Sequence, residues 1–234
     1  MNSELKLNTP DILIYLIYHD DVSYKRIVKY EKYDYIKMIK IESTKYFESI
    51  IFKYLFENKN EWIQKSHVGI LTYTFETKIK KNLDELYEII KNKIYQKNDV
   101  ITFFNVGKNL LENMKCHTYL GEIFDYSLPK IGINDKIHYD KIPGFYCNYW
   151  LAKTDIFNNY VTFANEYMKI LDNNDDTFLQ KLVNSDAQYR SCTEVASAQL
   201  QKIIGYPYYI YHCFVMERLP CIYFFMNNIA TSSI

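Results

Sequence analysis

A continuous apolar run at residues 12–18 constrains the fold of this chain more than any other feature. A strand with one face in water alternates apolar and polar side chains, whereas a run without alternation indicates a strand covered on both faces. Such strands lie inside parallel sheets that carry helices on both sides. The run ends at His19, Asp20 and Asp21, so a loop is expected at the carboxyl end of a central strand.

Strand and helix patterns alternate along most of the remaining chain. Apolar runs predict further strands at 37–41, 68–73, 99–104, 145–152 and 208–211. Apolar residues at helical spacing predict helices at 45–60, 83–94, 155–171, 177–183 and 194–204, and a shorter one near 110–114. Residues 127–144 are expected to form a long loop, and 226–234 to fray. The alternation predicts an α/β fold, with a mostly parallel central sheet flanked by helices, in a single domain of 234 residues.

The composition predicts which kinds of partner this protein binds and in which cellular compartment it lies. The formal net charge is zero and the lysines are dispersed, so we expect no nucleic-acid partner. No apolar run approaches the ~20 residues of a membrane span. The five cysteines lack CxxC spacing and the N-terminus is polar, which predicts reduced thiols in a cytoplasmic, non-secreted protein. The 24 Tyr and 14 Phe would suit a sugar-binding surface, although a coding bias toward Ile, Lys, Asn and Tyr explains them more simply.

Several common catalytic and nucleotide-binding motifs are absent from the sequence. No GxGxxG follows the first strand, and there is no Walker A sequence. GxSxG, HExxH and paired CxxC patterns are also missing. Any nucleotide must therefore be held by side chains and by backbone at strand ends rather than by a glycine-rich phosphate loop.

Two polar clusters stand out within apolar sequence, at 145–150 and at 212–219. Their Asn, His, Glu and Arg side chains need partners if they are buried. In open α/β sheets, ligands bind beyond the carboxyl ends of the parallel strands. We therefore expect both clusters to meet the strand ends at a single cleft.

Four segments, 15–21, 68–73, 145–153 and 212–219, resemble in this order the corresponding segments of small GT-A-like glycosyltransferases. Such domains are found in viral proteins and in bacterial enzymes that build capsules and exopolysaccharides. The resemblance implies a single GT-A-like (Rossmann-like) domain. A donor-binding half would cover about 10–126, and an acceptor and catalytic half about 127–228.

The resemblance also implies a reaction, in which a sugar passes from a nucleoside-diphosphate sugar, most simply a UDP-sugar, to a glycan or glycoprotein acceptor. The protein would act in the cytoplasm, which would be the host's cytoplasm if the protein is viral. Many GT-A enzymes hold the donor diphosphate through Mn²⁺ or Mg²⁺ on an Asp-x-Asp motif, which is absent here; Thr72 and Tyr73 stand where it is expected. This departure leaves metal dependence and activity open. A non-catalytic module that binds a glycan or a protein is the main alternative, and an unrelated Rossmann-like enzyme is disfavoured by the absent glycine loop.

The resemblance and the strand ends together nominate a set of donor-binding side chains. They are Tyr18, His19, Asp20, Ser43, Thr72, Tyr73, Asn148 and Trp150. Each has a structural alternative: Asp20 could cap a turn, Ser43 or Thr44 could cap a helix, and Asn148 could bond to backbone. We expect Tyr73 or Trp150 to stack on the base or a sugar.

Glu217 and Arg218 are the principal catalytic candidates. A carboxylate with a raised pKa can take the proton of the acceptor hydroxyl, and a guanidinium can bind the departing diphosphate with two parallel hydrogen bonds. Asp140, in the long loop, is a second candidate base. His212 is a candidate metal ligand. The structural alternatives are an internal Glu217–Arg218 ion pair and a hydrogen-bonded core histidine. The sequence leaves the oligomeric state open.

Overall fold

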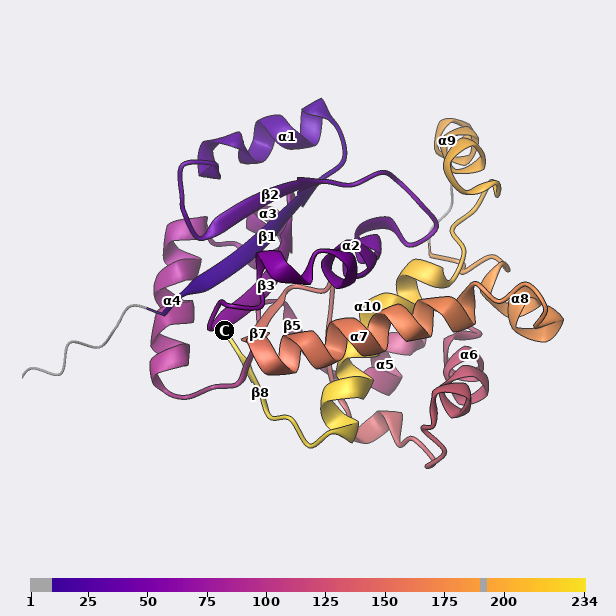
Figure 1. Cartoon of the computed structure of the whole chain (residues 1–234). Coiled ribbons are helices and arrows are strands. Elements are labelled where there is room, and N and C mark those ends of the chain that lie inside the picture. The colour runs from indigo at the N-terminus through magenta and orange to yellow at the C-terminus, as the bar shows by residue number, and fades with distance from the viewer. Residues whose placement is uncertain (1–9, 190–192) are drawn as a thin grey trace, which may run out of the picture.

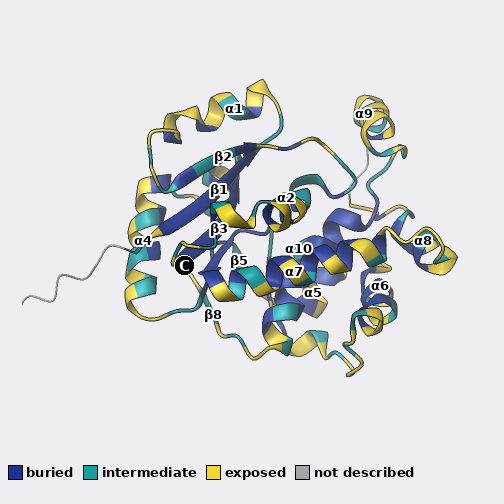
Figure 2. Ribbon diagram, viewed as in Figure 1, coloured by how far each residue is buried: buried dark blue, intermediate teal, exposed yellow. Residues whose placement is uncertain are grey.

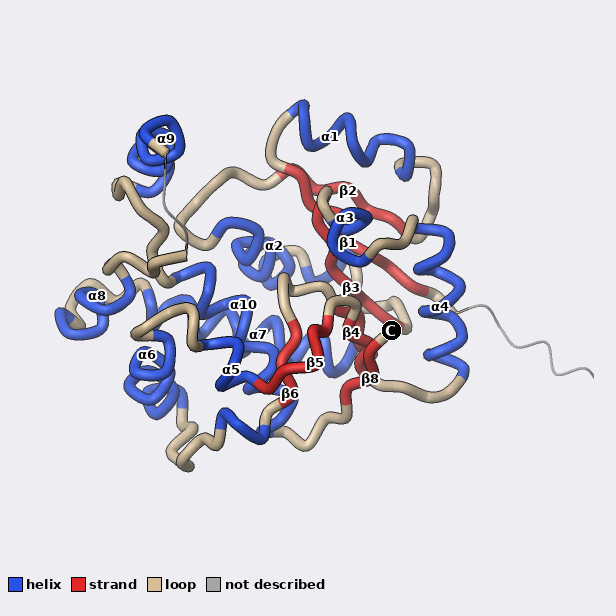
Figure 3. The backbone as a smooth tube through the Cα atoms, turned by 180° about the vertical axis from the view of Figure 1, so that it is seen from behind, coloured by secondary structure: helices blue, strands red, loops and turns tan. Residues whose placement is uncertain are grey.

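The computed structural model describes residues 10–189 and 193–234, which form an α/β domain with a central sheet (Figure 1). The strands of the main sheet are β1 (Ile12–Tyr18), β2 (Ile36–Lys40), β3 (His67–Thr72), β4 (Val100–Thr102), β7 (Trp150–Lys153) and β8 (Thr231–Ser233). A two-stranded sheet is made by β5 (Asn105–Asn109) and β6 (Pro143–Phe145). It lies between β4 and α5 (Figure 3).

The helices occupy the segments between the strands. They are α1 (Asp21–Ile27), α2 (Ile51–Glu57), α3 (Phe75–Ile79), α4 (Leu83–Tyr95), α5 (Leu110–Met114), α6 (Leu120–Ser127), α7 (Thr154–Leu171), α8 (Thr177–Val183), α9 (Glu194–Ile204) and α10 (His212–Met226). Short 3-10 turns are η1 (Val28–Tyr30), η2 (Phe47–Ile50), η3 (Lys59–Glu61), η4 (Leu128–Ile131) and η5 (Tyr139–Lys141). In the described part of the chain, no helix is long and apolar enough to cross a membrane.

The main sheet has the strand order β2-β1-β3-β7-β4-β8. β1 pairs in parallel with both β2 and β3, and β4 pairs in parallel with β8. β7 lies between β3 and β4 and is antiparallel to both. The predicted α/β class and mostly parallel sheet are confirmed. Because β7 runs against its neighbours, it begins at the edge where they end.

Each face of the sheet is covered by its own core, as the apolar run in β1 predicts. On one face, side chains such as Tyr15 and Trp150 pack with residues of α2, α6, α7 and α10. On the other, Ile14 and Leu16 pack with residues of α1, α3 and α4. Figure 2 shows β1, β3 and much of α10 as buried, whereas α9 stands apart and is mostly exposed.

Three local predictions are wrong. The expected strand at 145–152 is interrupted by a turn at 146–149, in which Cys147 and Asn148 adopt φ angles of 65° and 54°. Residues 208–211 form no strand. Tyr211 is the N-cap of α10, and its amide donates to the Val183 carbonyl, 2.9 Å away. The 226–234 segment does not fray, because β8 pairs with β4 and the Ile234 amide donates to the Thr102 carbonyl, 3.2 Å away.

Candidate active site

The carboxyl ends of β1, β2 and β3 meet the beginning of β7 at one edge of the sheet. The Ile41 amide, after β2, donates to the Tyr18 carbonyl at 3.0 Å. The Tyr73 amide, after β3, donates to the Ile17 carbonyl at 2.9 Å. These backbone bonds hold the segments beyond the strands next to one another, which places their side chains at a shared edge.

The turn at 146–149 lies at the centre of this edge. Asn148 is 2% exposed, and its Nδ2 donates to Ser49 Oγ, in η2, at 3.0 Å. The Tyr149 hydroxyl shares hydrogen bonds with the hydroxyls of Thr72 and, at 3.0 Å, Thr74. A left-handed conformation is unfavourable for residues other than Gly and, to a lesser extent, Asn, so the bonds from Asn148 and Tyr149 help to hold the turn in place.

Two cations from different helices pack against this turn. Lys78, in α3, donates from Nζ to Cys147 Sγ at 3.2 Å, and its ammonium lies 5.2 Å from the ring centre of Tyr149. Arg218, in α10, is 4% exposed, and its guanidinium carbon lies 5.7 Å from the ring centre of Tyr146. A buried guanidinium and a half-buried ammonium therefore border one turn of four residues.

Two carboxylates accompany these cations. Glu217 Oε2 accepts a hydrogen bond from Arg218 Nη1 at 2.8 Å. Glu48 Oε1, in η2, lies 3.8 Å from His19 Nε2, which follows β1. We refer to His19, Glu48, Lys78, Glu217 and Arg218 as the polar cluster.

The pKa of Glu217 is raised by its environment. Burial is the main cause; Arg218 and Lys78 act against it, and the Glu48 carboxylate adds to it. Glu217, Lys78 and Glu48 also act on Cys147, whose thiol pKa is raised to about 11, mainly by burial. Glu48, Lys78 and Glu217 therefore act on one another and on Cys147, although they come from three separate elements.

His19 and Glu48 shift each other's pKa in opposite directions. Burial alone would lower the pKa of His19, but the neighbouring carboxylate raises it above its ordinary value. Burial alone would raise the pKa of Glu48, but His19 lowers it overall. Both shifts favour the charged forms of these two side chains, which lie next to the end of β1.

Several predicted donor-binding residues lie at this edge. The Tyr73 ring is in edge contact with His19, with centres 5.8 Å apart, and the Arg26 guanidinium carbon lies 5.6 Å from its centre. Thr72 and Asn148 are buried and bond to protein groups, so they hold the turn in position rather than face a ligand.

Three other candidates at or near the strand ends have structural or exposed positions. Asp20 is the N-cap of α1 and accepts from the Ser23 amide at 2.7 Å. Tyr18 packs on Tyr24, with ring centres 5.1 Å apart. Ser43 is exposed after β2.

The expectation that Trp150 faces a cleft is wrong. It is 0% exposed and packs among Phe52, Phe157, Tyr160 and Phe224. Strand alternation explains the difference: within the 150–153 strand, Trp150 points to the face that α7 covers. Its rings cannot stack on a ligand in this conformation.

Two further candidates lie apart from the polar cluster. His212 is 0% exposed at the start of α10, in edge contact with Tyr46, and burial lowers its pKa to about 3. Asp140 is exposed on η5, which packs against α5. No hydrogen bond or ion pair within the described residues joins either side chain to Glu217 or Arg218.

Sequence reasoning missed Glu48, Lys78 and Cys147. Glu48 and Lys78 sit in short helical segments, where a charged residue usually marks a solvated face. Cys147 lies in a segment predicted as a regular strand. The only signal in the sequence is that Lys78 follows Thr72, the last residue of β3, by six residues, and in open α/β sheets ligands bind beyond the carboxyl ends of the strands.

The side chains at this edge do not suit a divalent cation. Mg²⁺ and Mn²⁺ prefer several oxygen ligands, chiefly carboxylates. Glu48 and Glu217 are each already next to a cation. Within residues 10–189 and 193–234, no three or more His, Cys, Asp or Glu side chains are gathered to hold a metal ion. The side chains of the polar cluster therefore do not fit a Mg²⁺ or Mn²⁺ ion.

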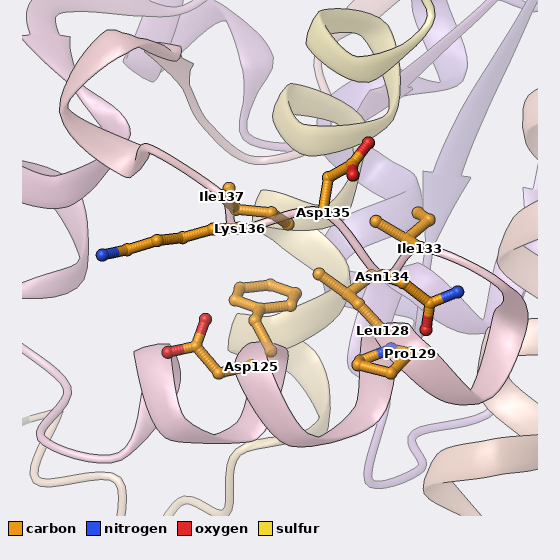
Figure 4. A pocket seen from close by; sticks show the side chains of 9 residues that line it. Asp125, Leu128, Pro129, Ile133, Asn134, Asp135, Lys136 and Ile137 are labelled. Atoms are coloured by element: carbon orange, nitrogen blue, oxygen red, sulfur yellow. The ribbon is translucent and has the colours of Figure 1, made fainter.

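The described part of the chain also contains a cavity of about 230 Å³ (Figure 4). It is lined by α6, η4 and the segment that follows, including Asp125, Asn134, Asp135 and Lys136. None of the polar cluster lines it.

The α/β fold of this chain is similar to that of a solved glycosyltransferase. A solved structure with this fold is the apo form of the bifunctional glycosyltransferase WbbM, with a TM-score of 0.54 and 16% sequence identity. The match covers 96% of this chain and 44% of WbbM, so the chain spans less than half the length of that protein. No family model matches the sequence, and no curated protein matches it. At this level of identity the likeness shows the fold alone.

Proposed function

We propose that this domain is a glycosyltransferase that moves a sugar from a nucleoside-diphosphate sugar, UDP-linked in the first instance, to a hydroxyl of a glycan or glycoprotein. The main support for this function is that Glu217 and Arg218 lie at the strand ends of a glycosyltransferase-like sheet. In such sheets the ligand lies beyond the carboxyl ends of the strands. At that edge, a carboxylate of raised pKa can take the acceptor proton and a buried guanidinium can stabilise the departing diphosphate.

Glu217 is the proposed general base. The acceptor oxygen forms a bond to the anomeric carbon while the bond from that carbon to the diphosphate oxygen breaks. The acceptor proton passes to the Glu217 carboxylate, and the electron pair of the broken bond leaves on the diphosphate. A raised pKa suits this role, because a base is most effective when its pKa lies near the working pH.

Arg218 is proposed to stabilise the leaving diphosphate. Its Nη1 donates to Glu217 and to the Phe214 carbonyl, at 2.8 and 3.3 Å, which holds the guanidinium in place before the reaction. A cation held in advance stabilises developing negative charge without reorganisation. Tyr73 and His19 are proposed to bind the base and ribose, because they flank the end of the central strands.

A thermal-shift screen against UDP, GDP, CMP and dTDP, each with and without Mn²⁺, tests the proposal. A ligand bound only by the folded state at 100 times its Kd adds about 2.7 kcal/mol of stability. For a domain of this size that is roughly 5–11 °C in Tm. We expect a shift of this kind with one nucleoside diphosphate, followed by slow hydrolysis of the matching donor sugar.

The Glu217→Gln variant is the matched control. It should keep the thermal shift and lose hydrolysis, because the amide cannot accept the proton. If no nucleotide shifts the Tm, the domain is a non-catalytic binding module with this fold. A shift with mono- or triphosphates only would point to another class of nucleotide-binding protein.

A further inference from the structure

We propose that Lys78 and Arg218 together neutralise the diphosphate of the donor, so that this domain binds its donor without a divalent cation. This inference rests on the proposed function. The two side chains come from α3 and α10 and each carries a positive charge, that of Arg218 being paired with Glu217. Sequence reasoning did not identify Lys78, whose only signal in the sequence is its place shortly after β3.

The first argument is that both cations pack on the same turn. Lys78 Nζ lies 3.2 Å from Cys147 Sγ, and the Arg218 guanidinium lies 5.7 Å from the ring centre of Tyr146, the preceding residue. Asn148, the next residue, is fixed by its hydrogen bond to Ser49. The turn thus sets the spacing of two cations that belong to separate helices.

The second argument is that both cations retain hydrogen-bonding capacity. An ammonium has three N–H donors, yet Lys78 Nζ donates to a thiol, Cys147 Sγ, which is a weak acceptor. Lys78 forms no ion pair at 4.0 Å or less within the described residues. Arg218 is buried, and its Nε lacks a hydrogen-bond partner. Buried polar groups normally have partners, so phosphate oxygens would complete both sets.

The third argument is that the nearby carboxylates pair with cationic side chains of the protein rather than with a metal ion. Glu217 is bonded to Arg218, and Glu48 is paired with His19. The pKa of Lys78 is raised above its ordinary value: burial would lower it, but Tyr149, Cys147 and Glu48 outweigh that effect. The ammonium therefore stays charged over the working range of pH.

The experiment compares Lys78→Met, Lys78→Arg and a matched control, Lys91→Met. Lys91 also lies over a tyrosine ring, 5.0 Å from the centre of Tyr87, but it is on α4 and pairs with Glu88 rather than with a residue of the polar cluster. Binding of UDP and of uridine is measured by calorimetry, each with and without EDTA. If the thermal-shift screen selects another nucleotide, its diphosphate and nucleoside replace this pair.

We expect Lys78→Met to weaken UDP binding by about 10- to 100-fold, the range for one hydrogen bond to a charged group. Uridine binding should be unchanged, because uridine has no phosphate. Lys78→Arg should restore most of the UDP affinity, Lys91→Met should match the wild type, and EDTA should not alter wild-type binding. Rescue by arginine separates a charge effect from general loss of folding.

Two results would overturn the inference while leaving the proposed function intact. One is UDP binding by Lys78→Met as tight as that of the wild type. The other is loss of wild-type binding in EDTA. If the wild type binds no nucleoside diphosphate at all, the proposed function itself fails and this inference fails with it.

Discussion

The Glu217→Gln substitution distinguishes a general base from a structural ion pair, because the two roles predict opposite changes of stability with pH. The carboxyl is about a quarter exposed, and its pKa is raised mainly by burial, with Glu48 adding to the effect. In the folded state Glu217 therefore keeps its proton to a higher pH than in the unfolded state, where the pKa is about 4.5. Folding binds a proton in that interval, so stability falls as pH rises through the raised pKa.

The glutamine variant lacks this titration. The Tm of the wild type minus that of Glu217→Gln should therefore be larger near about pH 4.5 than near about pH 8, where wild-type Glu217 must ionise. Each pKa unit corresponds to about 1.4 kcal/mol. At about 2–4 °C per kcal/mol for a domain of this size, the difference changes by roughly 3–6 °C for each unit. Other titrating groups are present in both proteins and largely cancel.

The assay is calorimetric unfolding of both proteins across this pH range, with donor hydrolysis measured in parallel. Loss of a general base typically lowers the rate by about 10²- to 10⁴-fold. A stabilising Glu217–Arg218 ion pair would give the reverse trend, with the wild-type advantage growing as the carboxylate ionises. That trend, with hydrolysis unchanged in the variant, would refute the assignment of Glu217 as a base.

Substitutions at three further positions test residues that the structure assigns to folding rather than to direct contact with the ligand. Trp150→Ala should lower the free energy of unfolding by about 3–5 kcal/mol, measured by urea titration, because it opens a cavity in the core; the milder Trp150→Phe should leave nucleotide affinity unchanged. Asp20→Ala removes the cap of α1, so we expect a lower Tm and unchanged affinity in the thermal-shift screen. Asn148→Ala loses the bond to Ser49 in a left-handed position, which should lower stability by about 1–3 kcal/mol and also weaken UDP binding through the displaced turn.

The sequence predicts the centre of this fold well and its periphery poorly. The β1 strand occupies the apolar run at 12–18, because a stretch with no polar residues must be covered on both faces. β8 was missed because Thr231–Ser233 is polar, and only pairing with β4 makes it a strand. The interruption of 145–152 depends on a left-handed pair of residues that no glycine marks.

Only some residues of the candidate site could be predicted from the sequence. His19, Tyr73, Glu217 and Arg218 could be nominated because they follow strands or interrupt apolar sequence. Lys78 could not, since a lysine on a short helix has the same local pattern whether it faces water or a buried turn. Its position depends on the tertiary packing of α3 against residues nearly seventy positions away, which hydrophobic periodicity does not encode.

The strand order has a consequence for the order of folding. β1, β2 and β3 are close in sequence and can pair early. The pairing of β3 with Trp150–Lys153 and of β4 with Thr231–Ser233 joins segments that are far apart in sequence. Contacts between such distant segments slow folding, because a long loop must close before they form. The edge that carries Lys78, Glu217 and Arg218 is therefore assembled only after α10 has been synthesised. A nascent chain would have its first parallel strands in place well before the charged groups meet.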